Sequence, residues 1–426
     1  MVKRSRFVTN FLALLTSRAA AQLVSVVAGL LLVRLLADAV FGAYSLATTT
    51  IGLAGIVADF GLDVLLIREI ASKPDRALGL LRTAYILRLI FSTSITLLLV
   101  ILATTNDLLG RPDLLLIGGL SLIPRGLFRA SAAGLTAQGR IKDAAIIEAV
   151  AGLSSAFLSF TLVIIVLTLR KNFLFPLPDG AAAALWGMVI GNTCGWWAAI
   201  HIQTSSTTSV ARRAVSRSEL GALLWAAVPF VLVALAGAGF QSLDIYMVKQ
   251  FHWTDASPDA VALYAAPFRI LNVLLLVPTV WGVVALPRYT RFLRKPAALR
   301  MLIRRDSFTT LLMGLALSAA CTLLAYPLTA LGLGVTYLAT APILGLIGWM
   351  TLPACMSAPL IALLTATNRQ RWIVISVVIA GVGSLIANIV WGYTAVNADV
   401  ITGLMGVAAI KVGAMVMLLG LYWLRR

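Results

Sequence analysis

Charged side chains are scarce in this sequence, and acidic ones are the scarcest. Charged residues make up 12% of the chain, and 34 of them are basic against 16 acidic. A soluble protein has about 25% charged residues, so this composition excludes an ordinary soluble domain. Hydrophobic residues make up 60% and the mean hydropathy is +0.97. The chain is therefore expected to cross a membrane several times.

Histidine and cysteine are nearly absent, which removes most catalytic and metal-binding arrangements. The three cysteines, Cys194, Cys321 and Cys355, lie in apolar runs without CxxC spacing, and there are only two histidines. The sequence contains no Walker motif for ATP, no Ser/His/Asp set and no paired carboxylates in a loop. It predicts a transporter and not an enzyme, with no catalytic residue, no metal and no cofactor. No nucleic-acid-binding module is visible.

Long apolar runs predict an all-α protein with about twelve transmembrane helices. The runs are continuous, whereas strands of a membrane barrel alternate, so helices are favoured. The first run is too long for a signal peptide and is taken as the first span. The spans are expected at 10–36, 40–66, 83–105, 113–137, 144–168, 181–203, 220–248, 261–286, 307–332, 339–366, 371–395 and 400–423.

Basic residues gather on one side of these expected spans. The largest group lies between Arg288 and Arg305. The opposite side holds little more than Arg111, Arg170, Lys171 and Lys249. Loops rich in Lys and Arg face the cytoplasm. With an even number of spans, both termini are then expected in the cytoplasm, and this bias explains most of the net charge of +18.

The chain is expected to consist of two parallel six-helix lobes. The longest polar linker lies near the middle, which predicts an N-terminal lobe over 1–205, a cytoplasmic linker over 206–219 and a C-terminal lobe over 220–426. Adding one fixed number of residues to five positions in or just after span four leads to the same five residue types in or just after span ten. This number is called the repeat offset below. The set is Pro124, Leu135, Thr136, Ala137 and Arg140, which match Pro353, Leu364, Thr365, Ala366 and Arg369. Parallel repeats of this kind are typical of alternating-access transporters.

Several basic residues fall inside the expected spans. An ionisable group in hydrocarbon costs at least about 2.5–3.5 kcal/mol, so each needs a partner or a function. Arg125 and Arg129 are the clearest, because four residues apart they share one helix face directly after Pro124. Arginine matches phosphate bidentately. We expect a cationic site for phosphate or pyrophosphate, formed by Arg18, Arg125, Arg129, Arg269 and Lys411.

Internal ion pairing is the alternative interpretation of these charges. The acidic candidates for structural or coupling ion pairs are Asp59, Asp63, Glu148 and Asp244. Asp59 and Asp63 are expected to pair with Arg68 or its neighbours. Arg88 and Glu148 lie near enough to span ends to reach the interface by snorkelling. The sequence leaves both interpretations open.

Four short motifs stand near the start of the chain. They are Arg34-Leu35-Leu36, Phe41-Gly42-Ala43-Tyr44, Phe60-Gly61-Leu62 and Arg68-Glu69. With these motifs, residues 29–75 resemble the opening of the polysaccharide transporters. These are the O-antigen (Wzx-type) oligosaccharide flippases of the multidrug/oligosaccharidyl-lipid/polysaccharide (MOP) exporter superfamily.

The resemblance implies a V-shaped pair of six-helix lobes in the bacterial inner membrane. It implies transport of an undecaprenyl-pyrophosphate-linked oligosaccharide between leaflets, with basic residues meeting the pyrophosphate. The implied partners are that lipid-linked oligosaccharide, membrane lipids, and the polysaccharide polymerase and chain-length machinery. Two alternatives remain. One is a drug/cation antiporter of the same superfamily, although the deep charges have the wrong sign for it. The other is a polytopic glycosyltransferase or ligase.

Overall fold

The structure is a computed structural model, and it describes all but the N-terminus and several short connections. The described ranges are 23–72, 77–105, 111–172, 179–204, 217–250, 260–293, 295–367, 369–395 and 398–424. Within these ranges the elements are α-helices and two short 3-10 helices, and nine helical segments are long and apolar enough to cross a membrane. The prediction of an all-α, multi-pass membrane protein is confirmed.

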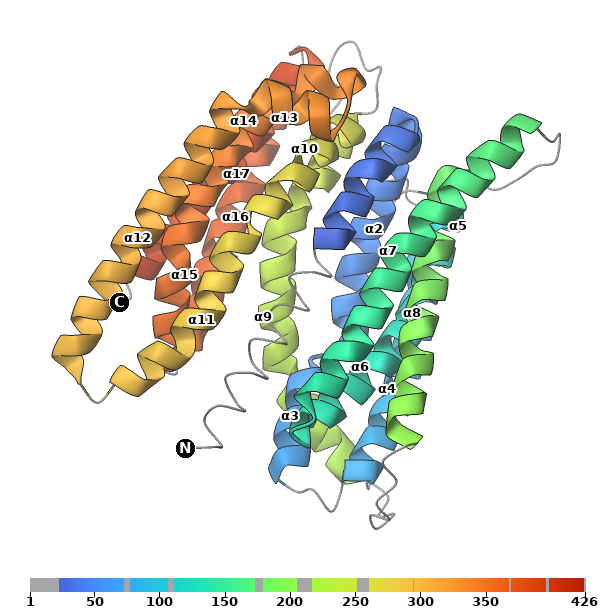
Figure 1. Ribbon diagram of the computed structural model, residues 1–426, viewed down its shortest axis with the longest axis vertical. Helices are drawn as coiled ribbons and strands as arrows, with labels where there is room; N and C mark the ends of the chain where they lie inside the picture. Colours follow the sequence, from blue (N-terminus) through green and yellow to red (C-terminus); the bar gives the residue numbers. More distant parts are fainter. Residues whose placement is uncertain are drawn as a thin grey trace. The chain divides into compact units, whose positions relative to one another are not determined.

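The helices fall where the apolar runs predicted them. Expected spans two to twelve each coincide with one helix or with a run of consecutive helices (Figure 1). The described end of span one is helical from Leu23 to Leu35, and the remainder of that span lies outside the described residues.

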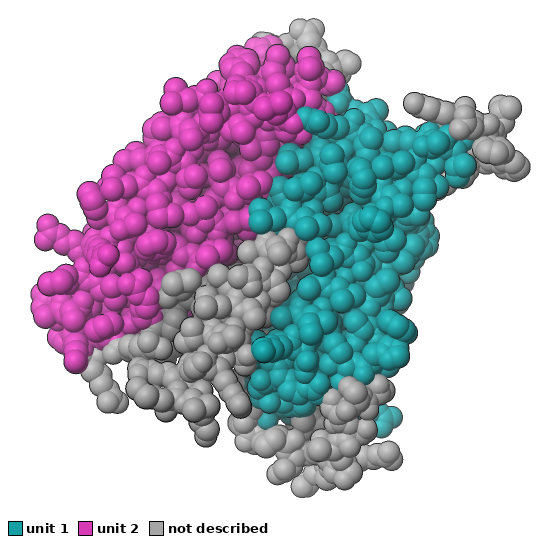
Figure 2. Space-filling view, in the orientation of Figure 1, with its two compact units in different colours: residues 1–235 teal, residues 236–426 magenta. Residues whose placement is uncertain are grey.

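Two compact units make up the chain, Met1–Leu235 and Ala236–Arg426, drawn in different colours in Figure 2. Unit 1 contains α2 (Asp38–Asp59), α3 (Leu62–Ser72), α4 (Ala77–Thr105), α5 (Pro112–Leu120), α6 (Leu122–Ala137), α7 (Ile141–Asn172) and α8 (Gly180–Thr204). The division falls inside α9 (Arg217–Gln250), because the first part of α9 packs Ala227 against Leu62 and Leu65 of α3. The expected linker at 206–219 lies mostly outside the described residues, so the lobe boundaries stay a prediction.

Unit 2 holds the remaining helices. They are α10 (Ala260–Leu274), α11 (Leu276–Phe292), α12 (Pro296–Leu323), α13 (Ala325–Gly332), η3 (Val335–Thr340), α14 (Ala341–Ile347), η4 (Gly348–Met350), α15 (Thr351–Ala366), α16 (Gln370–Thr394) and α17 (Val400–Leu424).

The structure supports the internal repeat. The repeat offset, which carries Pro124 onto Pro353, also carries the first and last residues of α6 onto those of α15. Both helices end alike: the Arg140 N–H donates to the Leu135 carbonyl at 2.9 Å, and the Arg369 N–H donates to the Leu364 carbonyl at 2.8 Å. A slightly smaller offset relates both bounds of α8 to those of α17. Within each unit the two helices also pack together, α6 against α8 and α15 against α17.

Span two is broken between α2 and α3. Phe60 has a φ of 44° and is the one non-glycine residue with positive φ among the described residues; Gly61 follows with a φ of 65°. The Phe60 ring packs against Phe91 of α4, with the ring centroids 5.3 Å apart. Left-handed backbone is unfavourable for a residue with a side chain. This contact helps to hold the break, which has Asp59 on one side and Asp63 on the other.

Helices α7 and α8 pack side by side at very short range (Figure 1). Small residues at every fourth position allow the backbones to approach, as is common between membrane helices. On α8 they are Gly187, Gly191 and Gly195, which face Ser159, Ser155 and Ala151 of α7. A Cβ at Gly191 would lie 2.2 Å from the Ser155 backbone nitrogen, so no larger residue fits there.

Replacing Gly191 by leucine should force α7 and α8 apart. We expect a loss of stability of at least about 3 kcal/mol, the upper end of the usual cost of overpacking, because the obstacle is backbone. The measurement is the melting temperature of the purified protein in detergent. Gly420→Leu is the control, since a Cβ at Gly420 would meet no atom within 4 Å. Equal melting temperatures for the two variants would contradict this packing.

Candidate functional site

Charged side chains from four helices of unit 1 meet in one cluster. Two carboxylates flank the break between α2 and α3, and three guanidiniums come from α4 and α6. The members of this charged cluster are Asp59, Asp63, Arg88, Arg125 and Arg129. The four-residue spacing on α6 therefore directs both of its arginines to the same group of acids, as expected for one helix face.

Arg129 bridges the two carboxylates. Its Nη1 lies 2.8 Å from Asp59 Oδ2, and its Nη2 lies 2.5 Å from Asp63 Oδ2. The Arg129 side chain remains 36% exposed. One guanidinium thus ties the end of α2 and the start of α3 to the middle of α6.

Arg88 of α4 is fully buried, with a relative exposure of 0%. Its Nη2 pairs with Asp63 Oδ1, and its Nη1 donates to the Gly126 carbonyl at 2.6 Å. The expectation that Arg88 reaches the membrane interface by snorkelling was wrong, because carboxylate and carbonyl partners are available inside the unit. Asp59 and Asp63 are paired with these guanidiniums of α4 and α6.

Arg125 differs from the other two arginines of the cluster. Among the described residues, no hydrogen bond or ion pair to its guanidinium is found, and its side chain is half-buried. It lies against Gly55 of α2, where a Cβ would be 3.4 Å from Arg125 Nη1. Asp59 and Asp63 attract it at longer range, while Arg88 and Arg129 repel it. A guanidinium carries five N–H donors, so Arg125 can bind a ligand.

The charge of the cluster favours an anion as that ligand. Three guanidiniums face two directly paired carboxylates, and Glu148 of α7 attracts Arg129 from farther away. A buried charge without a close partner is costly. A phosphate group placed on Arg125 would remove that cost and would gain charge-assisted hydrogen bonds.

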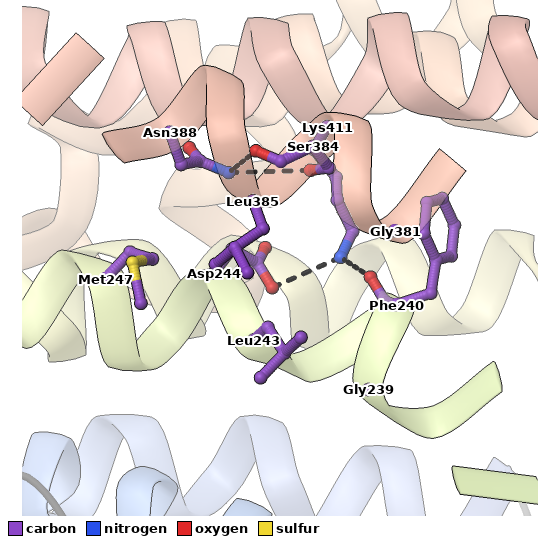
Figure 3. Close-up of a pocket in the computed structure, with 10 residues that line it drawn as sticks. All are labelled: Gly239, Phe240, Leu243, Asp244, Met247, Gly381, Ser384, Leu385, Asn388 and Lys411. Atoms are coloured by element: carbon purple, nitrogen blue, oxygen red, sulfur yellow. Dashed lines mark hydrogen bonds and ion pairs between the residues drawn. The ribbon is translucent and has the colours of Figure 1, made fainter. Parts of the chain in front are cut away.

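Unit 2 contains a second buried ion pair. Lys411 of α17 and Asp244 of α9 are both almost fully buried, with Lys411 Nζ 3.1 Å from Asp244 Oδ1. Figure 3 shows the Lys411 ammonium between this carboxylate and the Phe240 carbonyl, to which it also donates. The Tyr264 hydroxyl donates to the other Asp244 oxygen. Lys411 therefore has a carboxylate, a carbonyl and, 5.1 Å away, the Phe240 ring as partners.

The remaining predicted site residues lie apart or outside the described part. Arg269 is half-buried on α10 of unit 2, two residues after Pro267, and Glu148 is half-buried on α7. Both already have an interaction within the chain. Arg18 lies outside the described residues. Within the described ranges, no group of three His, Cys, Asp or Glu side chains could hold a metal ion.

Several solved transporter structures are similar to this chain. The chain is similar to an inward-facing multidrug resistance MATE family transporter of the MOP superfamily, with a TM-score of 0.68, 14% identity and coverage of 95% of this chain and 94% of that one. The lipid II flippase MurJ in an inward closed conformation gives a TM-score of 0.66 at 14% identity, covering 96% and 86%. A MOP superfamily transporter from Pyrococcus furiosus gives 0.64 at 14% identity, covering 98% and 94%.

These likenesses define the fold as that of the MOP superfamily of transporters. The sequence matches the family described as polysaccharide biosynthesis protein over residues 7–293, and the chain belongs to this family. No curated protein sequence matches it significantly. The predicted family relationship is confirmed. The fold is one that transporters of the MOP superfamily share.

The ion pair of unit 2 predicts a specific pattern of stability. Lys411→Met should destabilise the protein by about 3–5 kcal/mol, because Asp244 is left buried without its cation. Lys411→Met combined with Asp244→Asn should recover most of that loss, since neither charge remains. Melting temperatures of the purified variants test this, with Lys142→Met at an exposed position of α7 as control. A double variant no more stable than the single one would contradict the pairing.

Proposed function

We propose that this protein is a flippase for an undecaprenyl-pyrophosphate-linked oligosaccharide. It moves this lipid from the inner to the outer leaflet of the bacterial inner membrane by alternating access, with both termini in the cytoplasm. The observation that carries the proposal is the guanidinium of Arg125, held in a group of five charges without a hydrogen bond or ion pair among the described residues. The family and the transporter fold support it.

Arg125 and Arg129 receive the pyrophosphate in this mechanism. They project from one face of α6, and guanidiniums bind phosphate oxygens in bidentate geometry. Asp63 and Asp59 hold Arg129 in place before the ligand arrives, so little side-chain entropy is lost on binding. The proposed orientation turns the C-terminal end of α6 toward the cytoplasm, the side from which the substrate enters.

The same carboxylates limit how tightly the anion binds. Asp59 and Asp63 already neutralise most of the charge on Arg88 and Arg129. A transported ligand must bind well enough to enter and weakly enough to leave. A cluster in which two of the three guanidiniums are already paired fits that requirement better than three unopposed cations would.

An antiporter for cationic drugs is the second candidate, because a MATE transporter shares the fold. Such a protein would need membrane-embedded carboxylates that are free to bind a cation or a proton. Asp63 is shared between Arg88 and Arg129, and Asp244 is held by Lys411 and Tyr264. We therefore favour the anionic lipid as substrate, with the polysaccharide polymerase and chain-length machinery as partners downstream.

Arg125→Gln should impair transport without harming the fold. Loss of a charge-assisted contact worth about 1.5–3 kcal/mol corresponds to roughly a 10- to 100-fold lower rate. The assay follows a fluorescent polyprenyl-pyrophosphate oligosaccharide in proteoliposomes, with and without an imposed membrane potential. Arg300→Gln, at an exposed position of α12, is the matched control and should transport normally.

Arg88→Gln separates the binding role from the structural role. It should lower the melting temperature, because Arg88 is buried against Asp63, whereas Arg125→Gln should not. An Arg125→Gln variant that transports at the wild-type rate would disprove the site. A wild-type protein that leaves the lipid in place but exchanges a cationic dye for protons or sodium would establish the antiporter instead.

A further inference from the structure

Unit 2 contains a cavity of about 500 Å³, and none of the described residues that line it is charged. Its walls come from α9, α11, α15, α16 and α17. Ligand-binding pockets in proteins have volumes of about 300–1,000 Å³, so the cavity is large enough for part of a substrate. The Lys411–Asp244 pair is outside its lining.

The internal repeat relates this cavity to the charged cluster. Ala354 and Ala358 of α15 line the cavity, and the repeat offset makes them the counterparts of Arg125 and Arg129 on α6. The same face of a duplicated helix therefore carries two guanidiniums in unit 1 and two methyl groups in unit 2. The two units present opposite chemistry at equivalent places.

Three of the five polar side chains that line the cavity have already used their donors; the other two are Gln241 and Tyr422. Ser357 donates to the Pro353 carbonyl at 2.7 Å, and Thr365 donates to the Ile361 carbonyl at 2.7 Å. Thr279 likewise donates to a carbonyl of its own helix, at 2.8 Å. A sugar would need such donors and acceptors to replace its water. Hydrocarbon needs none, so the lining suits an apolar chain better than an oligosaccharide.

We propose that this cavity binds a segment of the isoprenoid chain of the substrate. The inference rests on the proposed function, in which the substrate has three parts, the pyrophosphate, the sugar and the isoprenoid chain. Only the chain is apolar throughout. Glycine and alanine in the walls, at Gly237, Gly282, Ala354 and Ala358, leave the space that its methyl branches occupy.

The test uses photolabelling with an uncharged polyprenol that carries a diazirine. The purified full-length protein in lipid nanodiscs is irradiated with this probe, and the labelled peptides are mapped by mass spectrometry. We expect adducts on the lining segments of α11, α15 and α17, suppressed by excess unlabelled polyprenol. Because the probe has no phosphate, Arg125→Gln should be labelled as strongly as the wild type.

Two glycine substitutions fill the cavity from different walls. A Cβ at Gly237 would meet no atom within 4 Å, and a Cβ at Gly282 would meet only the Ala358 carbonyl, at 3.9 Å. The Cβ of a leucine is therefore accommodated at either position, and its side chain should take the volume of two or three CH₂ groups of the chain. Labelling should fall about 15- to 60-fold in Gly237→Leu and in Gly282→Leu. Gly413→Leu, also without neighbours within 4 Å but outside the lining, should label normally.

The outcomes separate this inference from the proposed function. Equal labelling by a phospholipid whose acyl chain carries the diazirine would show a site for bulk lipid and would overturn the inference. Unchanged labelling in both cavity-filling variants would overturn it as well. Cavity labelling by polyprenol together with normal transport by Arg125→Gln would refute the pyrophosphate site and leave the isoprenoid site standing.

Discussion

Asp63 holds two guanidiniums at once, and the arrangement of unit 1 depends on that shared carboxylate. It binds Arg88 of α4 and Arg129 of α6, so that three helices meet at one half-buried carboxylate. The break at Phe60 places it there, directly after the end of α2. Removing one partner from such a group leaves the others uncompensated. Asp59 and Asp63 form ion pairs with Arg88 and Arg129. The N–H donors of Arg125 therefore remain available for a ligand.

The two units contain equivalent helices that carry different side chains. Helices α6 and α15 share their bounds once the repeat offset is applied, yet the arginine positions of the first are alanines in the second. Unit 2 keeps its own buried charges elsewhere, on α9 and α17. The two units therefore share similar helices, and the proposed anion site and the proposed isoprenoid site differ at these positions by arginine against alanine.

The helices and the arginine face of α6 could be predicted from the sequence because both depend on short-range patterns. Continuous apolar runs located the spans, and a four-residue spacing placed Arg125 and Arg129 together. The partners of the charges could not be predicted, since they depend on packing. Arg88 meets Asp63 across 25 residues and Lys411 meets Asp244 across 167. In the sequence, only the glycine that follows Phe60 indicates the left-handed backbone there.

The most direct test is an experimental structure of the protein with a bound isoprenyl pyrophosphate. The central claim is that the Arg125 guanidinium of the charged cluster receives the anion. A phosphate oxygen should then lie about 2.7–2.9 Å from a guanidinium nitrogen of Arg125, with Arg88 still paired to Asp63. A pyrophosphate bound elsewhere, with no contact to Arg125 or Arg129, would contradict the account.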